Sequence, residues 1–155
     1  MKKKLSVIVP IYNVEKYLKR CLNSLVNQSL EDIEVICIND GSKDKSLDIL
    51  RVFEKKYPDI IKVIDKQNEG VWKARMDGIK KATGDYIGFV DSDDYVNEDF
   101  ALKLYSNAIR NESDISVCTR RYVVGRASIS TRSWLRRNMS NNSSPTMEQR
   151  PMSAL

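Results

Sequence analysis

Short hydrophobic runs alternate along the chain with longer stretches in which hydrophobic positions recur every three or four residues. The short runs are rich in valine and isoleucine and predict buried strands at residues 5–9, 33–38, 60–64, 86–90 and 115–118. The longer stretches have helical spacing and predict helices at residues 14–27, 45–56, 71–82 and 98–111. This alternation predicts an α/β fold with a mostly parallel, Rossmann-like sheet and helices on both faces.

The pattern ends after residue 124. Residues 125–155 are rich in Ser, Asn, Arg and Met, and residues 138–151 contain almost nothing to bury, which is typical of disorder. We therefore expect one folded domain at residues 1–124 and an atypical basic, disordered tail at residues 125–155.

Polar clusters follow the first four predicted strands. They are residues 10–13, 39–42, 65–70 and 91–94. In an open parallel sheet, ligands bind beyond the carboxyl ends of the strands. The sequence therefore predicts a binding site at this edge, without saying which ligand it takes.

Charge and composition narrow the chemistry. The net charge is +5, but residues 120–155 carry it, because residues 1–119 have 19 Lys and Arg against 20 Asp and Glu. A nearly neutral body argues against nucleic acid as a partner. The absence of histidine excludes histidine acid–base chemistry and most zinc sites. Three widely spaced cysteines in apolar stretches, Cys21, Cys37 and Cys118, indicate buried thiols in a reducing compartment.

The N-terminal segment has the basic start and short apolar run of a signal peptide. Pro10 and charged residues follow at once, without a small-residue cleavage site, so we interpret the run as the first strand. No apolar run approaches the ~20 residues that span a membrane. We expect a cytoplasmic location, with the basic tail as a candidate for peripheral contact with the inner face of the membrane.

The fourth predicted strand ends in three acids within four residues, Asp91, Asp93 and Asp94. Carboxylates this close repel one another unless a cation lies between them, and Mg²⁺ or Mn²⁺ bridging to phosphate oxygens suits such a group. The same residues are also typical of a solvated turn that caps the next helix. Gly-rich phosphate-binding motifs are missing from the sequence.

Taken together, several segments resemble family-2 glycosyltransferases with the GT-A fold. The opening VIVPIYN and the later ATGDYIGFVDSDD are the most specific. The full set is residues 7–13, 15–18, 21–25, 34–36, 39–42, 68–70 and 82–94. The resemblance implies a nucleoside-diphosphate-sugar donor, usually a UDP-sugar, a glycan or lipid-linked acceptor, inversion at the anomeric carbon and a divalent metal, Mg²⁺ or Mn²⁺. It also implies a role in polysaccharide or glycolipid synthesis.

The resemblance also assigns residues. The donor-binding residues it implies are Pro10, Tyr12, Asn13, Glu15, Asp40, Gly41, Ser42, Asn68, Gly70, Arg75, Asp91, Ser92 and Asp93. Residues 10–13 and Glu15 would line the nucleoside pocket, and Asp40 would accept a hydrogen bond from the base. Asp93 would bind the metal, and Asp91 would contact the ribose or the water shell of the metal.

Two departures from the family pattern stand out. Met76 replaces the Asn of the family's Ala-Arg-Asn-x-Gly segment, and Asp77 is a candidate to substitute for it. The family's general base is a carboxylate well downstream of the D-x-D motif, but after Asp114 the sole acid is Glu148. The likeness also fades near residues 123–125. We therefore expect the donor half of such an enzyme without its acceptor half or an identifiable base, whether through truncation, a shifted frame or divergence.

Other functions remain open from the sequence alone. A non-catalytic nucleotide-sugar-binding module would share every donor-site residue. A phosphoacceptor signalling domain also places acids at strand ends, but it needs an acidic pair after the first strand, where this chain has Pro-Ile-Tyr-Asn.

Overall fold

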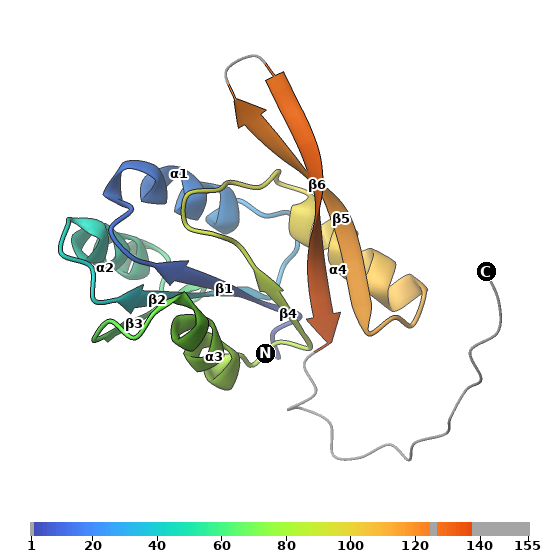
Figure 1. Cartoon of the computed structure of the whole chain (residues 1–155). Coiled ribbons are helices and arrows are strands. Elements are labelled where there is room, and N and C mark those ends of the chain that lie inside the picture. Colours follow the sequence, from blue (N-terminus) through green and yellow to red (C-terminus); the bar gives the residue numbers. More distant parts are fainter. Residues whose placement is uncertain (1, 125–126, 138–155) are drawn as a thin grey trace.

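The computed structural model describes residues 2–124 and 127–137 (Figure 1). The first eight elements are β1 (Leu5–Ile11), α1 (Glu15–Val26), β2 (Ile33–Asp40), α2 (Ser46–Lys56), β3 (Ile61–Lys66), α3 (Val71–Lys81), β4 (Tyr86–Phe89) and α4 (Phe100–Arg110). Strands β5 (Ile115–Val124) and β6 (Ala127–Arg137) follow. Each predicted helix is present, with ends within two residues of those expected. None of the helices in the described ranges is long and apolar enough to cross a membrane.

One six-stranded sheet organises the molecule, in the order β3-β2-β1-β4-β6-β5. Strand β1 is parallel to both β2 and β4, and β2 is parallel to β3. Strand β6 is antiparallel to β4 and β5. The predicted mostly parallel α/β fold is confirmed. The chain leaves β1 toward β2 and returns to β4 on its other side, so the carboxyl ends of these three strands meet at one edge.

Alternate residues of the central strands pack into two separate cores. Val7 and Val9 face a core built with α1, α2 and α4, whereas Ile8 packs with Ala74 of α3. Figure 1 shows the same division, with α3 on the opposite side of the sheet from α1 and α2. Burial on both faces explains why these strands are continuous hydrophobic runs rather than alternating ones.

The structure differs from the sequence prediction at residues 127–137. This segment, expected to belong to a disordered tail, forms β6 and lies between β4 and β5, with Ile87 opposite Arg136 and Val117 opposite Trp134. Main-chain hydrogen bonds to two neighbouring strands hold β6 in the sheet, although its sequence has no hydrophobic run. The hydrophobic pattern therefore did not predict this strand. The expected disorder of residues 138–151 lies outside the described residues.

A buried carboxylate ties the amino ends of the strands together. Glu34 of β2 is fully buried. It accepts hydrogen bonds from the Ser6 hydroxyl (2.5 Å), from Lys62 Nζ (2.5 Å), and from the main-chain N–H and hydroxyl of Thr83 (2.7 and 2.8 Å). Burial raises the pKa of Glu34, but the bonds from Lys62, Ser6 and Thr83 outweigh that effect and hold the pKa below its ordinary value. One side chain thus links β1, β2, β3 and the turn before β4.

The turn before β4 approaches β1 so closely that only glycine fits. The Ser6 hydroxyl accepts the Gly84 N–H at 2.8 Å. A Cβ on Gly84 would lie 2.6 Å from the main-chain nitrogen of Ser6. The sequence suggests a left-handed glycine at the end of α3, but Gly84 does not have a positive φ. The close approach to β1 is therefore the reason for glycine here.

We expect Glu34→Gln to lower the free energy of unfolding by about 2 kcal/mol at neutral pH, because it removes the charge on which these bonds depend. The pKa of Glu34 is lower in the folded than in the unfolded protein, so its stabilisation is present above about pH 4.3 and is lost as pH falls through the folded pKa. Urea unfolding of the native protein and of Glu34→Gln should therefore show that their free energies of unfolding become more similar below about pH 4. The control is Glu31→Gln, at an exposed position. An equal loss in both variants would contradict this role.

Candidate functional site

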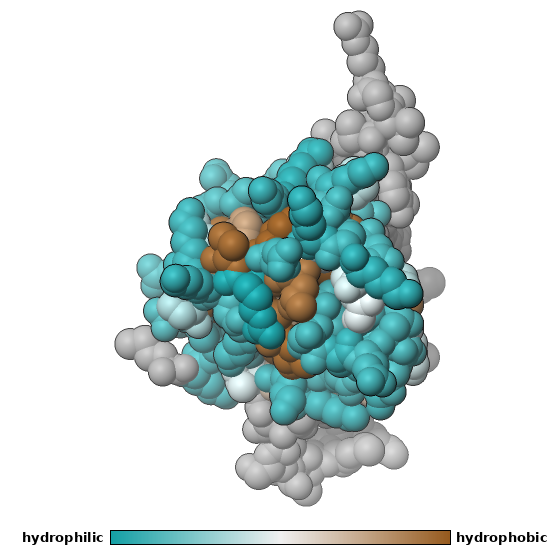
Figure 2. Space-filling model, turned by 90° about the vertical axis from the view of Figure 1, so that its left-hand side faces the viewer, coloured by the Kyte–Doolittle hydropathy of each residue, from teal (hydrophilic) through white to brown (hydrophobic). Residues whose placement is uncertain are grey.

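The polar clusters predicted from the sequence lie at the carboxyl ends of the strands. Strands β1 and β2 point toward the left in Figure 1, and Figure 2 shows the molecule from that side. Hydrophobic surface lies in the middle of this face, bordered by hydrophilic residues (Figure 2).

The loops after β1 and β2 hold each other by five hydrogen bonds. The main-chain N–H groups of Asn13 and Glu15 donate to Ser42 Oγ (3.1 Å) and Asp44 Oδ2 (2.9 Å). In return, the side chains of Asn13 and Glu15 accept the N–H groups of the residues that follow Ser42 and Asp44 (2.8 Å each). The two loops therefore hold each other in place by hydrogen bonds in both directions.

The residues of these loops differ in exposure and in their contacts. Asn13, just before α1, has a left-handed backbone (φ 52°), and its side chain bonds across to the loop after β2. Asp44 does accept the Ser46 N–H at the start of α2 (2.9 Å), as a cap would. Pro10 is buried inside β1, whereas Tyr12 is 48% exposed. Of the residues expected at the nucleoside pocket, Tyr12 is the one whose ring is open to a ligand, and such contacts remain predictions.

Asp40, at the end of β2, fixes the loop between β3 and α3. Its side chain is buried, and its two carboxylate oxygens accept the N–H groups of Glu69 (2.9 Å) and Gly70 (2.8 Å). The Asn68 side chain donates to the Asp40 carbonyl at 2.8 Å. Gly41 has φ +70°, and a Cβ there would lie 2.8 Å from Asn68 N. The predicted residues Asp40, Gly41, Asn68 and Gly70 thus form one packed unit.

Sequence reasoning missed the cation beside Asp40. Lys66 lies opposite Asp40 in the sheet register, with Nζ 3.8 Å from Asp40 Oδ1 and 3.1 Å from Asp77 Oδ2. It also pairs with Glu69. Hydrogen bonding to Glu69 raises the pKa of Lys66, burial opposes it, and Asp77 raises it further. Asp77, the candidate to take the place of the asparagine that Met76 replaces, is thus engaged with Lys66.

Arg75 of α3 reaches across to the acidic turn after β4. Its Nη2 lies 2.7 Å from Asp91 Oδ1, while its Nε is buried and has no hydrogen-bond partner in the part of the chain that the structure describes. Ser92 is buried and Asp93 is exposed. The structure therefore brings Arg75, one of the predicted donor-binding residues, into direct contact with Asp91.

A buried thiol lies beneath this turn. Cys21 Sγ is 3.7 Å from the Asp91 carbonyl oxygen. Burial, together with the carboxylates of Asp93 and Asp91, raises the pKa of Cys21 to about 12. The thiol therefore stays protonated and does not serve as a thiolate ligand or nucleophile. Cys21 and Cys37 are free and buried, as the sequence predicted, and the side chain of Cys118 lies outside the described residues.

The acidic turn fits a metal that arrives with its substrate. Within the described residues, no three His, Cys, Asp or Glu side chains come together as a preformed metal cluster. Magnesium and manganese need only one or two protein carboxylates when phosphate oxygens and water complete the shell. Exposed Asp93, with Asp91 two residues away, is such an oxygen donor set. The two remain predicted metal residues.

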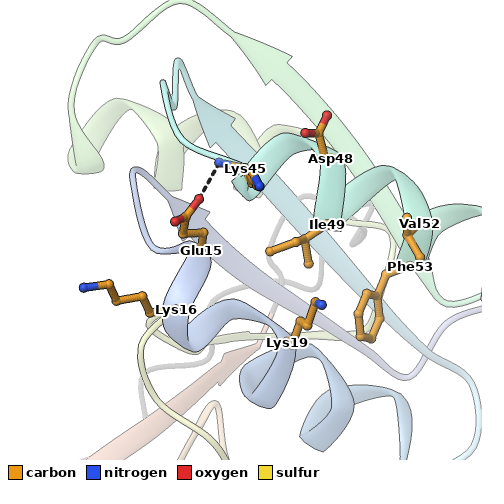
Figure 3. A pocket seen from close by; sticks show the side chains of 8 residues that line it. All are labelled: Glu15, Lys16, Lys19, Lys45, Asp48, Ile49, Val52 and Phe53. Carbon is orange, nitrogen blue, oxygen red and sulfur yellow. Dashed lines mark hydrogen bonds between the residues drawn. The ribbon is translucent and has the colours of Figure 1, made fainter.

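A separate groove runs between α1 and α2, with a cavity volume of about 400 Å³ (Figure 3). It is lined by Glu15, Lys16, Lys19, Lys45, Asp48, Ile49, Val52 and Phe53. Of the predicted site residues it includes Glu15, whose carboxylate is bound to the Lys45 N–H (Figure 3). The groove lies between helices rather than at the strand ends, and nothing in its lining indicates a particular ligand.

Comparison with known proteins agrees with this geometry. Residues 6–152 match the family model described as glycosyl transferase family 2, so the match continues beyond residue 124, where the sequence alone had shown the likeness fading. The chain is 44% identical over 126 residues to a poly(ribitol-phosphate) beta-glucosyltransferase of Bacillus spizizenii, covering 79% of the chain and 20% of that protein. It is 46% identical over 113 residues to the uncharacterized glycosyltransferase EpsJ of Bacillus subtilis, covering 73% and 33%.

Solved structures agree as well. S. aureus TarS 1-349 in complex with UDP is 37% identical, with a TM-score of 0.66, covering 72% of this chain and 34% of that one. The UDP-GlcNAc complex of the same protein gives 37% identity and a TM-score of 0.65, covering 72% and 33%. The chain therefore spans about one third or less of the length of these relatives.

Asp40→Asn should loosen the loop before α3, because an amide nitrogen cannot accept the second N–H. We expect the free energy of unfolding to fall by about 2 kcal/mol, and the amide protons of Glu69 and Gly70 to exchange faster with deuterium. Thermal unfolding and hydrogen exchange measure the two effects. Asp48→Asn, at an exposed acid of α2, is the matched control. Unchanged exchange at Glu69 and Gly70 would contradict the assigned role of Asp40.

Proposed function

The chain belongs to glycosyl transferase family 2, and on that premise we propose that it is the donor-binding part of an inverting glycosyltransferase that uses a UDP-sugar. One observation carries this proposal: residues implied in donor binding, from three separate loops, are linked at the same sheet edge. Asn13 and Glu15 are bonded to the loop of Ser42, and Asp40 is bonded to the loop of Gly70. The UDP and UDP-GlcNAc complexes of TarS support the choice of donor.

Asp40 is the proposed contact for the base. Its two oxygens each accept one N–H from the chain, whereas an ionised carboxylate has about four acceptor positions. The remaining capacity can accept an N–H from uracil, and the main-chain bonds hold the carboxylate in place for it. The exposed ring of Tyr12 offers an apolar face to the same base.

Asp93 and Asp91 are the proposed residues for Mg²⁺ or Mn²⁺. Bound there with the donor, the ion would stabilise the negative charge of the departing diphosphate. Asp93 is exposed and would contact the ion directly, while Asp91 is paired with Arg75. Ser92, between them in the sequence, is buried.

Transfer to an acceptor needs a base that activates the acceptor hydroxyl. We assign no residue of this chain to that role. We therefore propose that the chain itself binds the donor. Transfer to a glycan or lipid-linked acceptor is proposed for a longer protein, of the length of its relatives. The name of the poly(ribitol-phosphate) beta-glucosyltransferase supports a polymer acceptor.

Titration calorimetry of UDP into the chain, with and without Mn²⁺, tests donor binding. We expect binding that requires Mn²⁺ and that Asp93→Asn weakens by about tenfold or more, because the variant loses a charged oxygen ligand. The matched control is Asp99→Asn, at an acid that pairs with Lys103 on α4. Failure of the native chain to bind UDP in either condition would overturn the proposal, and so would equal losses in the two variants.

A further inference from the structure

The turn after β4 concentrates negative charge. Asp91, Asp93 and Asp94 lie within four residues, Asp93 is exposed, and the side chain of Asp91 is 38% exposed. Carboxylates at such short spacing disfavour one another unless a positive charge lies beside them. A metal ion would supply that charge when the donor is bound, and in the ligand-free chain another positive group has to supply it.

Arg75 supplies a positive charge to this turn. Its Nη2 lies 2.7 Å from Asp91 Oδ1, and its side chain is 35% exposed, so an incoming ligand can reach the pair. The residue lies on α3, whose first turn follows the loop that Asp40 fixes. The helix that carries Arg75 therefore starts at a loop of the proposed donor site.

The guanidinium is only partly satisfied in this arrangement. Its Nε is buried and lacks a hydrogen-bond partner within the described part of the chain. A buried donor without a partner is unfavourable, and guanidinium groups bind phosphate oxygens with paired, charge-assisted hydrogen bonds. A second arrangement, in which Arg75 leaves Asp91 and turns to an anionic ligand, would satisfy more of its donors.

We propose that Arg75 stands in for the divalent ion in the ligand-free protein, so that the metal binds together with the diphosphate and not before it. By holding Asp91, the guanidinium repels a free cation and occupies one of the two carboxylates proposed to hold it. The diphosphate of an incoming donor draws Arg75 away and frees Asp91 for the metal and its water shell. Metal and nucleotide then strengthen each other's binding by the same factor. This inference rests on the proposed donor site.

Mn²⁺ binding without nucleotide tests the inference, with free Mn²⁺ measured by electron paramagnetic resonance. We expect Arg75→Met to bind Mn²⁺ about tenfold more tightly than the native chain, since a positive charge beside the site is removed. The factor by which UDP improves Mn²⁺ affinity should fall in the same variant. If Arg75→Met fails to fold, Arg75→Gln, which keeps a polar side chain, should show the same gain in Mn²⁺ affinity.

Two controls locate the effect. Lys103→Met removes a positive charge that is likewise paired with an acid, Asp99, and should change Mn²⁺ affinity by no more than about twofold. Adding Asp93→Asn to Arg75→Met should abolish the gain. A merely structural role for Arg75 would lower Mn²⁺ affinity or leave it unchanged.

The inference is overturned if both Arg75 variants bind Mn²⁺ no more tightly than the native chain, or if Lys103→Met gains as much. Its failure differs from failure of the proposed function. A native chain that binds UDP with Mn²⁺ while the Arg75 variants show no gain defeats only the role of Arg75. A native chain that never binds UDP defeats the donor site itself.

Discussion

The geometry of the candidate site depends on the Asp40 carboxylate. It is buried at the end of β2, and it satisfies two main-chain N–H groups of the loop that leads into α3. Lys66 from the adjacent strand offsets part of its charge. Because α3 starts directly after this loop, the carboxylate also fixes the start of the helix from which Arg75 pairs with Asp91. The proposed base contact and the proposed metal turn are thereby linked through α3.

A second buried acid has a comparable role at the opposite end of the sheet. Glu34 gathers donors from β1, β3 and the turn before β4, and it is remote from the edge where the candidate site lies. The two acids of β2 therefore stabilise opposite ends of the sheet. Glu34 links the strands at their amino ends, and Asp40 organises the loops at their carboxyl ends. Removing a partner from such a network is costly because the remaining polar groups stay buried.

The sequence predicted the elements well because hydrophobic periodicity depends on local spacing. The four helices, the parallel core of the sheet and the edge that carries the polar clusters all follow from that pattern. The side-chain partners did not follow, because they depend on register between distant segments. Lys66 lies opposite Asp40 although 26 residues separate them, and Arg75 meets Asp91 from a helix on one face of the sheet. Strand β6 escaped prediction because main-chain pairing, rather than a hydrophobic run, places it.

Binding of a uridine diphosphate at the sheet edge that Asp40 organises can be followed by two-dimensional ¹H–¹⁵N NMR of the labelled chain while UDP and Mg²⁺ are added. The largest amide shift changes should fall in residues 11–13, 40–42, 68–70 and 91–93, with little change in α4. Changes concentrated instead in the groove between α1 and α2, or the absence of changes at the strand ends, would contradict it.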